Sequence, residues 1–307
     1  MNKLIYIIIF LGGFQLSHAQ QLPIFTQYQE AYSLLNPAAV SSNYLKYKMN
    51  MNTNAMYRYQ WVGIEGAPQT TLISHEWLNE DLNFLTGGSF TYDQTGPTSF
   101  LGLSSRFAYL LRLNRNNFIT AGITAGLVQY RVDGSQLEFQ EQGEVEDAGV
   151  NTFRPDFSLG AVWYYIPRRG NRYFAGISVP QTFGFNLAFR TENNEFNIQR
   201  VQHYYAFGGA QFDVGEGSWL ETDVWFKYVE NIPFHFDVNV RYEYRQIFWV
   251  GAGGSMSGAS HLETGIIWNI DGASFLRIGY GYDHFFTDYG PAFGDAHELK
   301  VTYMWQY

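Results

Sequence analysis

The chain has 307 residues, a formal net charge of −9 and no cysteine. Aromatic residues make up 19% of it, yet the mean hydropathy is only −0.21. A helical membrane protein would be far more hydrophobic, and nothing after the N-terminus approaches a run of about 18 apolar residues. No block of Lys and Arg offsets the negative charge, which argues against nucleic-acid binding. Without cysteine there is no disulfide framework, lipoprotein attachment or thiolate chemistry.

Residues 1–19 have the pattern of a secretory signal peptide. Lys3 supplies positive charge, and an apolar run from Leu4 to Leu11 follows it. Ser17 and Ala19 are small residues at the third and first positions before a cut, so cleavage is predicted after Ala19. The alternative interpretation is an N-terminal membrane anchor, but the run is too short to span a bilayer as a helix. Export of a cysteine-free chain suits a bacterial envelope protein.

The next segment, residues 20–45, does not alternate and contains Pro23 and Pro37. We expect it at the periplasmic mouth or in the lumen of the domain that follows. Residues 46–307 alternate between apolar and polar positions almost throughout, which predicts β-strands. We therefore expect one domain after the signal peptide and the N-terminal segment.

The clearest strand runs from Phe234 to Arg245. Its apolar row is Phe234, Phe236, Val238, Val240, Tyr242 and Tyr244, and its polar row is His235, Asp237, Asn239, Arg241, Glu243 and Arg245. A soluble sandwich would also alternate. However, an unbroken apolar face that recurs from strand to strand favours lipid outside and a polar lumen inside.

The first and last strands are predicted to pair with each other. In the first, Met49, Met51, Ala55, Tyr57, Tyr59 and Trp61 should face lipid, and Lys48, Asn50, Asn52, Asn54 and Arg58 should face the lumen. The last strand, Glu298 to Tyr307, places Leu299, Val301, Tyr303, Trp305 and Tyr307 on one face. Such an edge would aggregate in water, and barrel closure removes it.

The segments number about 14, an even count within the range of single-chain barrels. Tight turns are predicted around Glu80, Arg115, Arg169, Glu216 and Gly272, and longer links at 133–153, 182–197 and 285–295. Short turns that alternate with long links are typical of outer-membrane barrels. The predicted fold class is therefore all-β, a transmembrane antiparallel outer-membrane β-barrel of about 14 strands. The loop from Glu138 to Asp147 holds five carboxylates, so the outer face is predicted to be acidic.

No motif predicts an enzyme, a cofactor site or a metal site. The glycines from Gly251 to Gly258 lack the Gly-Lys-Ser/Thr ending of a phosphate loop. The seven histidines lack the spacing of a zinc site. A lipase would need Ser and His on one outward face, for which Ser178 with His203, or Ser260 with His261, are the nearest candidates. A lumenal histidine with satisfied hydrogen bonds is the favoured interpretation.

The predicted lumen rows carry both signs of charge. Mixed charges can pair across the interior and fill it, or they can line a pore. We expect a filled interior, because no segment has the character of a constriction loop.

Several motifs together resemble the PorP/SprF family of Bacteroidota outer-membrane proteins. The mature N-terminus reads Gln21-Leu22-Pro23-Ile24-Phe25-Thr26-Gln27-Tyr28, followed by Asn36-Pro37-Ala38-Ala39. A stretch with Arg58, Gln60, Trp61, Gly66, Pro68 and Thr70 comes next. The resemblance covers essentially the whole mature chain. Val40-Ser41 departs from the Ala-Gly that many members have.

The resemblance implies a non-enzymatic role in type IX secretion. Its implied partners are type IX secretion components and a large secreted surface protein such as an adhesin, with outer-membrane lipid around the barrel and no nucleic acid. The candidate interaction residues that it implies are Gln27, Tyr28, Asn36, Pro37, Arg58, Gln60, Trp61 and Pro68. From the strand pattern, Arg58 and Gln60 should face the lumen and Trp61 the lipid near the outer rim. The alternatives are a general solute channel or transporter and a lipid-modifying enzyme.

Overall fold

The computed structural model describes residues 25–133, 150–182, 185–190, 195–200, 202–230, 232–256, 258–286 and 294–307. The predicted signal peptide and the acidic loop from Glu138 to Asp147 lie outside the described residues. Among these residues no helix is both long and apolar enough to cross a membrane.

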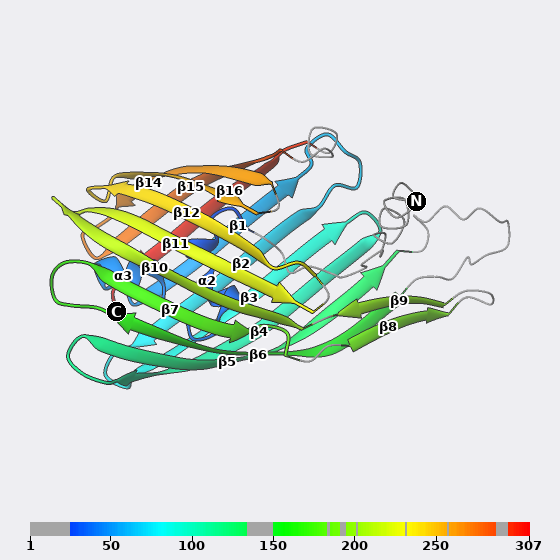
Figure 1. The fold of residues 1–307 in the computed structure, drawn as a ribbon, viewed down its shortest axis with the longest axis horizontal. Coiled ribbons are helices and arrows are strands. Elements are labelled where there is room, and N and C mark those ends of the chain that lie inside the picture. The colour runs from blue at the N-terminus through cyan, green and yellow to red at the C-terminus, as the bar shows by residue number, and fades with distance from the viewer. Residues whose placement is uncertain are drawn as a thin grey trace, which may run out of the picture.

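The chain forms a closed antiparallel barrel of fourteen strands, as predicted (Figure 1). Each strand pairs with its neighbours along the chain, and β10 follows β7 directly around the wall. The barrel strands are β1 (Met51–Gln60), β2 (Gln69–Asn79), β3 (Phe84–Thr95), β4 (Thr98–Arg112), β5 (Asn117–Val132), β6 (Val150–Tyr165), β7 (Arg172–Val179), β10 (His203–Gly215), β11 (Ser218–Val229), β12 (His235–Tyr244), β13 (Phe248–Ser255), β14 (Ala259–Asn269), β15 (Ser274–Phe285) and β16 (Ala296–Trp305).

The first and last strands close the barrel. β1 pairs with β16 over its full length, from Met51 opposite Trp305 to Gln60 opposite Ala296. This pairing removes both sheet edges, which is a condition for a sheet in a bilayer, because unpaired backbone groups are costly in hydrocarbon. The prediction that the C-terminal strand pairs with the first strand is confirmed.

Two strands lie outside the barrel. β8 (Phe185–Arg190) and β9 (Glu195–Arg200) form a separate two-stranded sheet between β7 and β10. This hairpin projects from the end of the barrel opposite the C-terminus (Figure 1). The sequence predicted only a long link here, at 182–197.

The alternation of each strand separates a lipid face from a lumen face. In β12, Phe236, Val238, Val240 and Tyr242 are exposed, whereas Asp237, Asn239, Arg241 and Glu243 are buried in the interior. The predicted rows of this strand are confirmed, except at its end. Arg245 lies in the β12–β13 turn and pairs with Glu216, because the strand stops at Tyr244.

The connections at the two ends of the barrel differ in length. The end that carries the C-terminus has the connections 80–83, 113–116, 166–171, 216–217, 245–247 and 270–273. The other end has 61–68, 133–149, 180–202, 230–234 and 286–295, together with the short 96–97 and 256–258. Outer-membrane barrels keep short turns on the periplasmic side, so the C-terminal end is the periplasmic end.

Three short helices precede the barrel wall: η1 (Tyr28–Glu30), α2 (Tyr32–Leu35) and α3 (Ser42–Tyr47). The side chain of Ser41 caps α3 by accepting a hydrogen bond from the backbone N–H of Tyr44 at 3.1 Å. Lys48 ends α3 in the left-handed conformation, with φ 63°. These helices lie inside the barrel, between its walls (Figure 1).

Two predicted orientations at the first strand are wrong. Met49 was expected to face lipid, but it is buried in a lumenal cluster with Trp249, Ile267, Phe275 and Met304. The left-handed residue before it delays the strand until Met51, so alternation cannot be extended back to Met49. Trp61 lies beyond the end of β1 with φ 55°, and it belongs to the β1–β2 connection rather than to a lipid-facing row.

Candidate functional site

Residues 25–49, here called the plug, occupy the lumen, and most of their side chains are buried. On one side the plug packs against apolar and aromatic side chains of the wall. Tyr32 stacks on Phe207 with ring centroids 5.2 Å apart, and Tyr28 lies 5.4 Å from the ring of Trp225. The rest of this cluster is Leu35, Ala38, Ala39, Val40, Tyr44 and Leu45 from the plug, and Leu78, Leu85, Ala108, Val162, Tyr164, Phe174 and Tyr205 from the wall.

On the other side the plug is held by ion pairs that centre on Glu30. One oxygen of Glu30 lies 2.7 Å from Arg241 and 3.3 Å from Arg277, and the other lies 2.9 Å from Lys300. The Glu30 side chain is only 2% exposed. One plug carboxylate therefore ties together three wall strands, β12, β15 and β16, in a site where an unpaired charge would be strongly destabilising.

A second ionic site lies at α3. Lys46 pairs with Glu221 of β11, and its Nζ lies 2.7 Å from Glu243 of β12. The Ser42 hydroxyl donates to Glu221 at 2.8 Å, and the Tyr47 hydroxyl donates to Glu243. The helix presents these groups to one wall because Ser42 and Lys46 are four residues apart, on the same helix face.

The start of the plug binds both the first and the last strand. The backbone N–H groups of Thr26 and Gln27 donate to the carboxylate of Glu298 at 2.7 and 3.0 Å. Arg58 donates to the Thr26 hydroxyl at 2.6 Å and pairs with Asp283. Arg58 therefore faces the lumen, as the strand pattern predicted.

The Asn36-Pro37 motif packs against β5 and β6 and reaches β7. The side-chain amide of Asn36 donates to the carbonyl of Ile177 at 2.8 Å, and its oxygen accepts from Ala38 N–H at 2.8 Å. A Cβ at Gly160 would lie 2.0 Å from the Asn36 side chain, and one at Gly122 would lie 2.7 Å from the Pro37 carbonyl oxygen. Glycine at these two wall positions is what lets the motif approach so closely.

The predicted interaction residues fall into three places. Gln27 and Tyr28 lie with Arg58 near the start of the plug, where the Tyr28 hydroxyl donates to Asp223. Asn36 and Pro37 lie against β5 and β6. Gln60, Trp61 and Pro68 lie at the outer end of the β1–β2 hairpin, where the Gln60 N–H donates to the Pro68 carbonyl at 3.0 Å.

Several residues of this site were not singled out from the sequence. They are Glu30, Lys46, Arg277 and Lys300, together with Glu298, which the sequence placed only at the start of the last strand. The available signal was a charged residue at a lumen-facing strand position, of the kind that had placed Arg58 of the first strand and the polar row of β12. The lack of alternation in the plug predicted a place at the periplasmic mouth or in the lumen, but not which of its side chains contact the wall.

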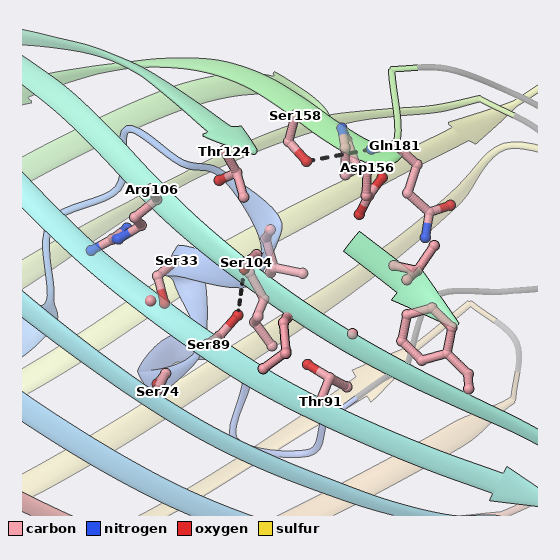
Figure 2. Close-up of a pocket in the computed structure, with 18 of the residues that line it drawn as sticks. Ser33, Ser74, Ser89, Thr91, Ser104, Arg106, Thr124, Asp156, Ser158 and Gln181 are labelled. Atoms are coloured by element: carbon pink, nitrogen blue, oxygen red, sulfur yellow. Dashed lines mark hydrogen bonds between the residues drawn. The ribbon is translucent and has the colours of Figure 1, made fainter. Parts of the chain in front are cut away.

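The described residues line two cavities that lie beside the plug. One, of about 100 Å³, lies between α2 and strands β2 to β6, and Figure 2 shows its hydroxyl-rich lining, with Ser33 from the plug opposite Ser89, Ser104 and Ser158 from the wall. It can hold a few waters but is well below the roughly 300 Å³ at which ligand pockets begin. The other, of about 410 Å³, lies towards the outer end and is lined in part by Phe25, Gln60, Trp225, Lys227 and His235.

The residue pairs that a lipase would need do not face outwards. Ser178 is buried and donates its hydroxyl to the carbonyl of Leu35 in the plug, and His203 is buried at the wall of the larger cavity. His261 is buried in the lumen and contacts Asn239 at 3.2 Å. Within the described part of the chain, no group of three or more His, Cys, Asp or Glu residues could hold a metal ion.

The sequence model of the family described as "Type IX secretion system membrane protein PorP/SprF" matches residues 17–303. The chain belongs to the PorP/SprF family. As a member, this PorP/SprF protein is associated with type IX secretion, and its barrel places it in the bacterial outer membrane. No curated protein matches the chain.

Solved structures with the same fold are outer-membrane channels. The Pseudomonas putida toluene transporter TodX has a TM-score of 0.57 and 9% identity, over 95% of this PorP/SprF chain and 96% of that chain. The Ralstonia pickettii toluene transporter TbuX also has a TM-score of 0.57 and 9% identity, over 90% and 93% of the two chains. The CymD monoaromatic hydrocarbon channel has a TM-score of 0.54 and 11% identity, over 93% and 94%. At these identities the likeness concerns the fold alone.

Proposed function

We propose that this protein is a non-enzymatic outer-membrane barrel that supports type IX secretion and holds a particular large secreted protein, such as an adhesin, at the cell surface. The observation that carries the proposal is the plug. A segment that pairs with β12, β15 and β16 through Glu30, and with β11 and β12 through Lys46, does not leave the lumen easily. A barrel filled in this way suits contact with other proteins better than flow of solutes.

The proposal divides the chain into a signal peptide at 1–19, an N-terminal segment at 20–45 that supplies most of the plug, and a barrel at 46–307. In it, Gln27, Tyr28, Asn36, Pro37 and Arg58 fix the plug in the wall. In the proposal, Trp61 and Pro68 of the β1–β2 connection contact a partner at the outer end of the barrel, together with Gln60 at the end of β1. The function needs no cofactor.

A general solute channel or transporter is the second candidate. Two observations favour it: the fold likeness to hydrocarbon channels and the cavity of about 410 Å³ towards the outer end. That volume lies within the range of small-molecule sites. For this candidate the plug would have to move, since it lies in the lumen.

The first experiment is a gentle-detergent purification of the tagged protein from its native outer membrane, read by mass spectrometry. Recovery of type IX components together with one large surface protein supports the proposal and names the secreted protein. Recovery of the barrel alone, under conditions that keep known complexes intact, contradicts it.

Planar-bilayer conductance separates the two candidates. We expect the purified barrel to pass no steady current, and a variant that lacks residues 20–45 to conduct if it still folds. Steady conductance of the intact protein would favour the channel. Heat-modifiability on a gel provides the control for folding of both proteins.

A further inference from the structure

Six cations gather on one sector of the periplasmic end, and we call them the basic rim. They are Lys48, Arg112, Arg115, Arg168, Arg169 and Arg172. They come from the end of the plug, from the β4–β5 and β6–β7 turns, and from the strand ends beside these turns. The chain as a whole has a net charge of −9, so this sector has the opposite sign to the rest of the molecule.

The two turns lie side by side. Asn117 pairs with Tyr165 across β5 and β6, and the N–H of Ile166 donates to the carbonyl of Asn116 at 2.7 Å. The side chain of Asn114 closes its own turn by accepting hydrogen bonds from the N–H groups of Asn116 and Asn117. Both turns lie at the end of the barrel that carries the C-terminus (Figure 1).

Three cations of the basic rim rest on aromatic rings at the mouth of the barrel. The guanidinium of Arg112 lies 5.3 Å from the Phe118 ring, that of Arg172 lies 4.3 Å from the Trp219 ring, and Lys48 Nζ lies 4.4 Å from the Tyr44 ring. Burial lowers the pKa of Lys48, and although Glu80 acts against this, Arg172 and Arg112 lower it further. The positive charges of Lys48, Arg112 and Arg172 therefore lie close together at the periplasmic mouth, and Glu80 offsets them only in part.

The four exposed arginines of the basic rim lack carboxylate partners in the described part of the chain, whereas Lys48 has Glu80 and Arg172 has Asp213 near it. Arg112, Arg115, Arg168 and Arg169 are exposed, and none of them forms an ion pair with a described carboxylate. Buried nitrogens Nε and Nη1 of Arg172 have no hydrogen-bond partner there.

Other turns at this end satisfy their charges locally. Glu216 pairs with Arg245, and Asp271 accepts three hydrogen bonds within its own turn. Glu80, in the neighbouring β2–β3 turn, acts on Lys48, and Asp213 of β10 acts on Arg172, so these two carboxylates offset only part of the charge of the six cations.

We infer that the basic rim docks an acidic surface of a periplasmic protein that covers the periplasmic mouth of the barrel. The inference rests on the proposed function, since it adds the chemistry of one secretion partner. A protein fits better than a membrane surface, because lipid headgroups surround the barrel, whereas Lys48, Arg112 and Arg172 lie over rings at its mouth. Charge complementarity of this kind steers association and fixes the orientation of the partner.

The test reverses charge at three turn residues that lie outside the strands, in the variant R115E/R168E/R169E. The matched control, R115K/R168K/R169K, keeps the charge and changes the side chains. Each full-length protein is purified from its native outer membrane at low and at moderate salt, and the bound proteins are quantified by mass spectrometry. We expect the glutamate variant to lose an acidic periplasmic component by at least about tenfold, while the surface protein stays bound and the lysine variant resembles the wild type.

Other results overturn the inference in distinguishable ways. Equal recovery of periplasmic components by the wild type and the glutamate variant removes the docking role and leaves the proposed function intact. A change confined to co-purifying anionic phospholipid shows that the rim contacts the membrane instead. Failure of the wild type to recover any type IX component removes the proposed function itself. Heat-modifiability of the variant barrels confirms that they fold.

Discussion

The two sides of the plug are held by different forces. Towards β12, β15 and β16 the plug presents Glu30 to three cations, and at its start it meets the Arg58, Asp283 and Glu298 group. Towards β2 to β7 and β10 it presents Tyr32, Leu35 and Val40 to apolar and aromatic side chains. The ion pairs of the first side form only when each charge meets its partner at short distance. The apolar contacts of the second side tolerate small shifts of the plug. The ionic side therefore determines where the plug sits, and the apolar side supplies much of its binding free energy.

The largest effect should follow from breaking the ionic side at its centre. Glu30→Gln keeps the shape of the side chain but removes the carboxylate with which the buried Lys300 forms its ion pair in the described structure. Removal of one member of a buried ion pair typically costs about 3–5 kcal/mol, so we expect the free energy of unfolding to fall by about that amount. Urea unfolding of the purified barrel measures it. Glu65→Gln, at an exposed position of the β1–β2 connection, is the control, and equal midpoints for the two variants would contradict the prediction.

The apolar side should respond to truncation at its centre. Leu35 is 5% exposed and packs within the aromatic cluster. Leu35→Ala should lower the free energy of unfolding by about 2–5 kcal/mol, because it removes buried methyl groups and leaves a cavity. Leu35→Met, which keeps most of the side-chain volume, should cost less than about 1.5 kcal/mol in the same urea unfolding experiment, and equal losses for the two variants would contradict the prediction.

A smaller effect should come from the wall glycine under Asn36. Gly160→Ala places a methyl group about where the Asn36 side chain lies, and overpacking of this kind costs about 1–3 kcal/mol. Gly254→Ala is the matched control, because its Cβ would have only an ordinary contact at 3.7 Å. Protease cleavage within residues 25–49 should rise for the first variant only. If cleavage rises equally in both variants, the close approach of the plug to β6 does not contribute to the stability of the plug in the barrel.

The smallest effect is expected at the exposed ion pair of the periplasmic end. Glu216 is 72% exposed and Arg245 is 46% exposed. Glu216→Gln should change the free energy of unfolding by less than about 1 kcal/mol, since water and salt screen such pairs. A loss as large as that of Glu30→Gln would show that burial does not decide the strength of these pairs.

The barrel was predictable from the sequence because its signal is local. In β12 each residue differs in polarity from the next, and this alternation alone places Val240 in lipid and Arg241 in the lumen. Tight turns such as that at Gly272, where φ is 84°, mark the strand ends in the same local way. The number of strands, and which side chains of a strand face lipid or lumen, follow from such patterns without any knowledge of distant contacts.

The plug contacts were not predictable for the opposite reason. Glu30 meets Arg241, Arg277 and Lys300, which lie on three strands far along the chain, and no pattern near Glu30 identifies them. Met49 shows the limit of local reasoning, because the left-handed Lys48 interrupts the alternation that was used to place it. The β8–β9 hairpin was not predicted either, because it lies outside the barrel sheet whose alternation predicted the other strands.

The contact of the plug with Glu298 has a consequence for biogenesis. The N–H groups of Thr26 and Gln27 bind a carboxylate that lies 272 and 271 positions further along the chain. That carboxylate faces Arg58 only when β16 has paired with β1, where Arg58 lies opposite Glu298. Contacts of such long sequence separation form late in folding. The first described residues of the protein can thus settle only after its last strand has joined the first, so a seated plug reports that the barrel has closed.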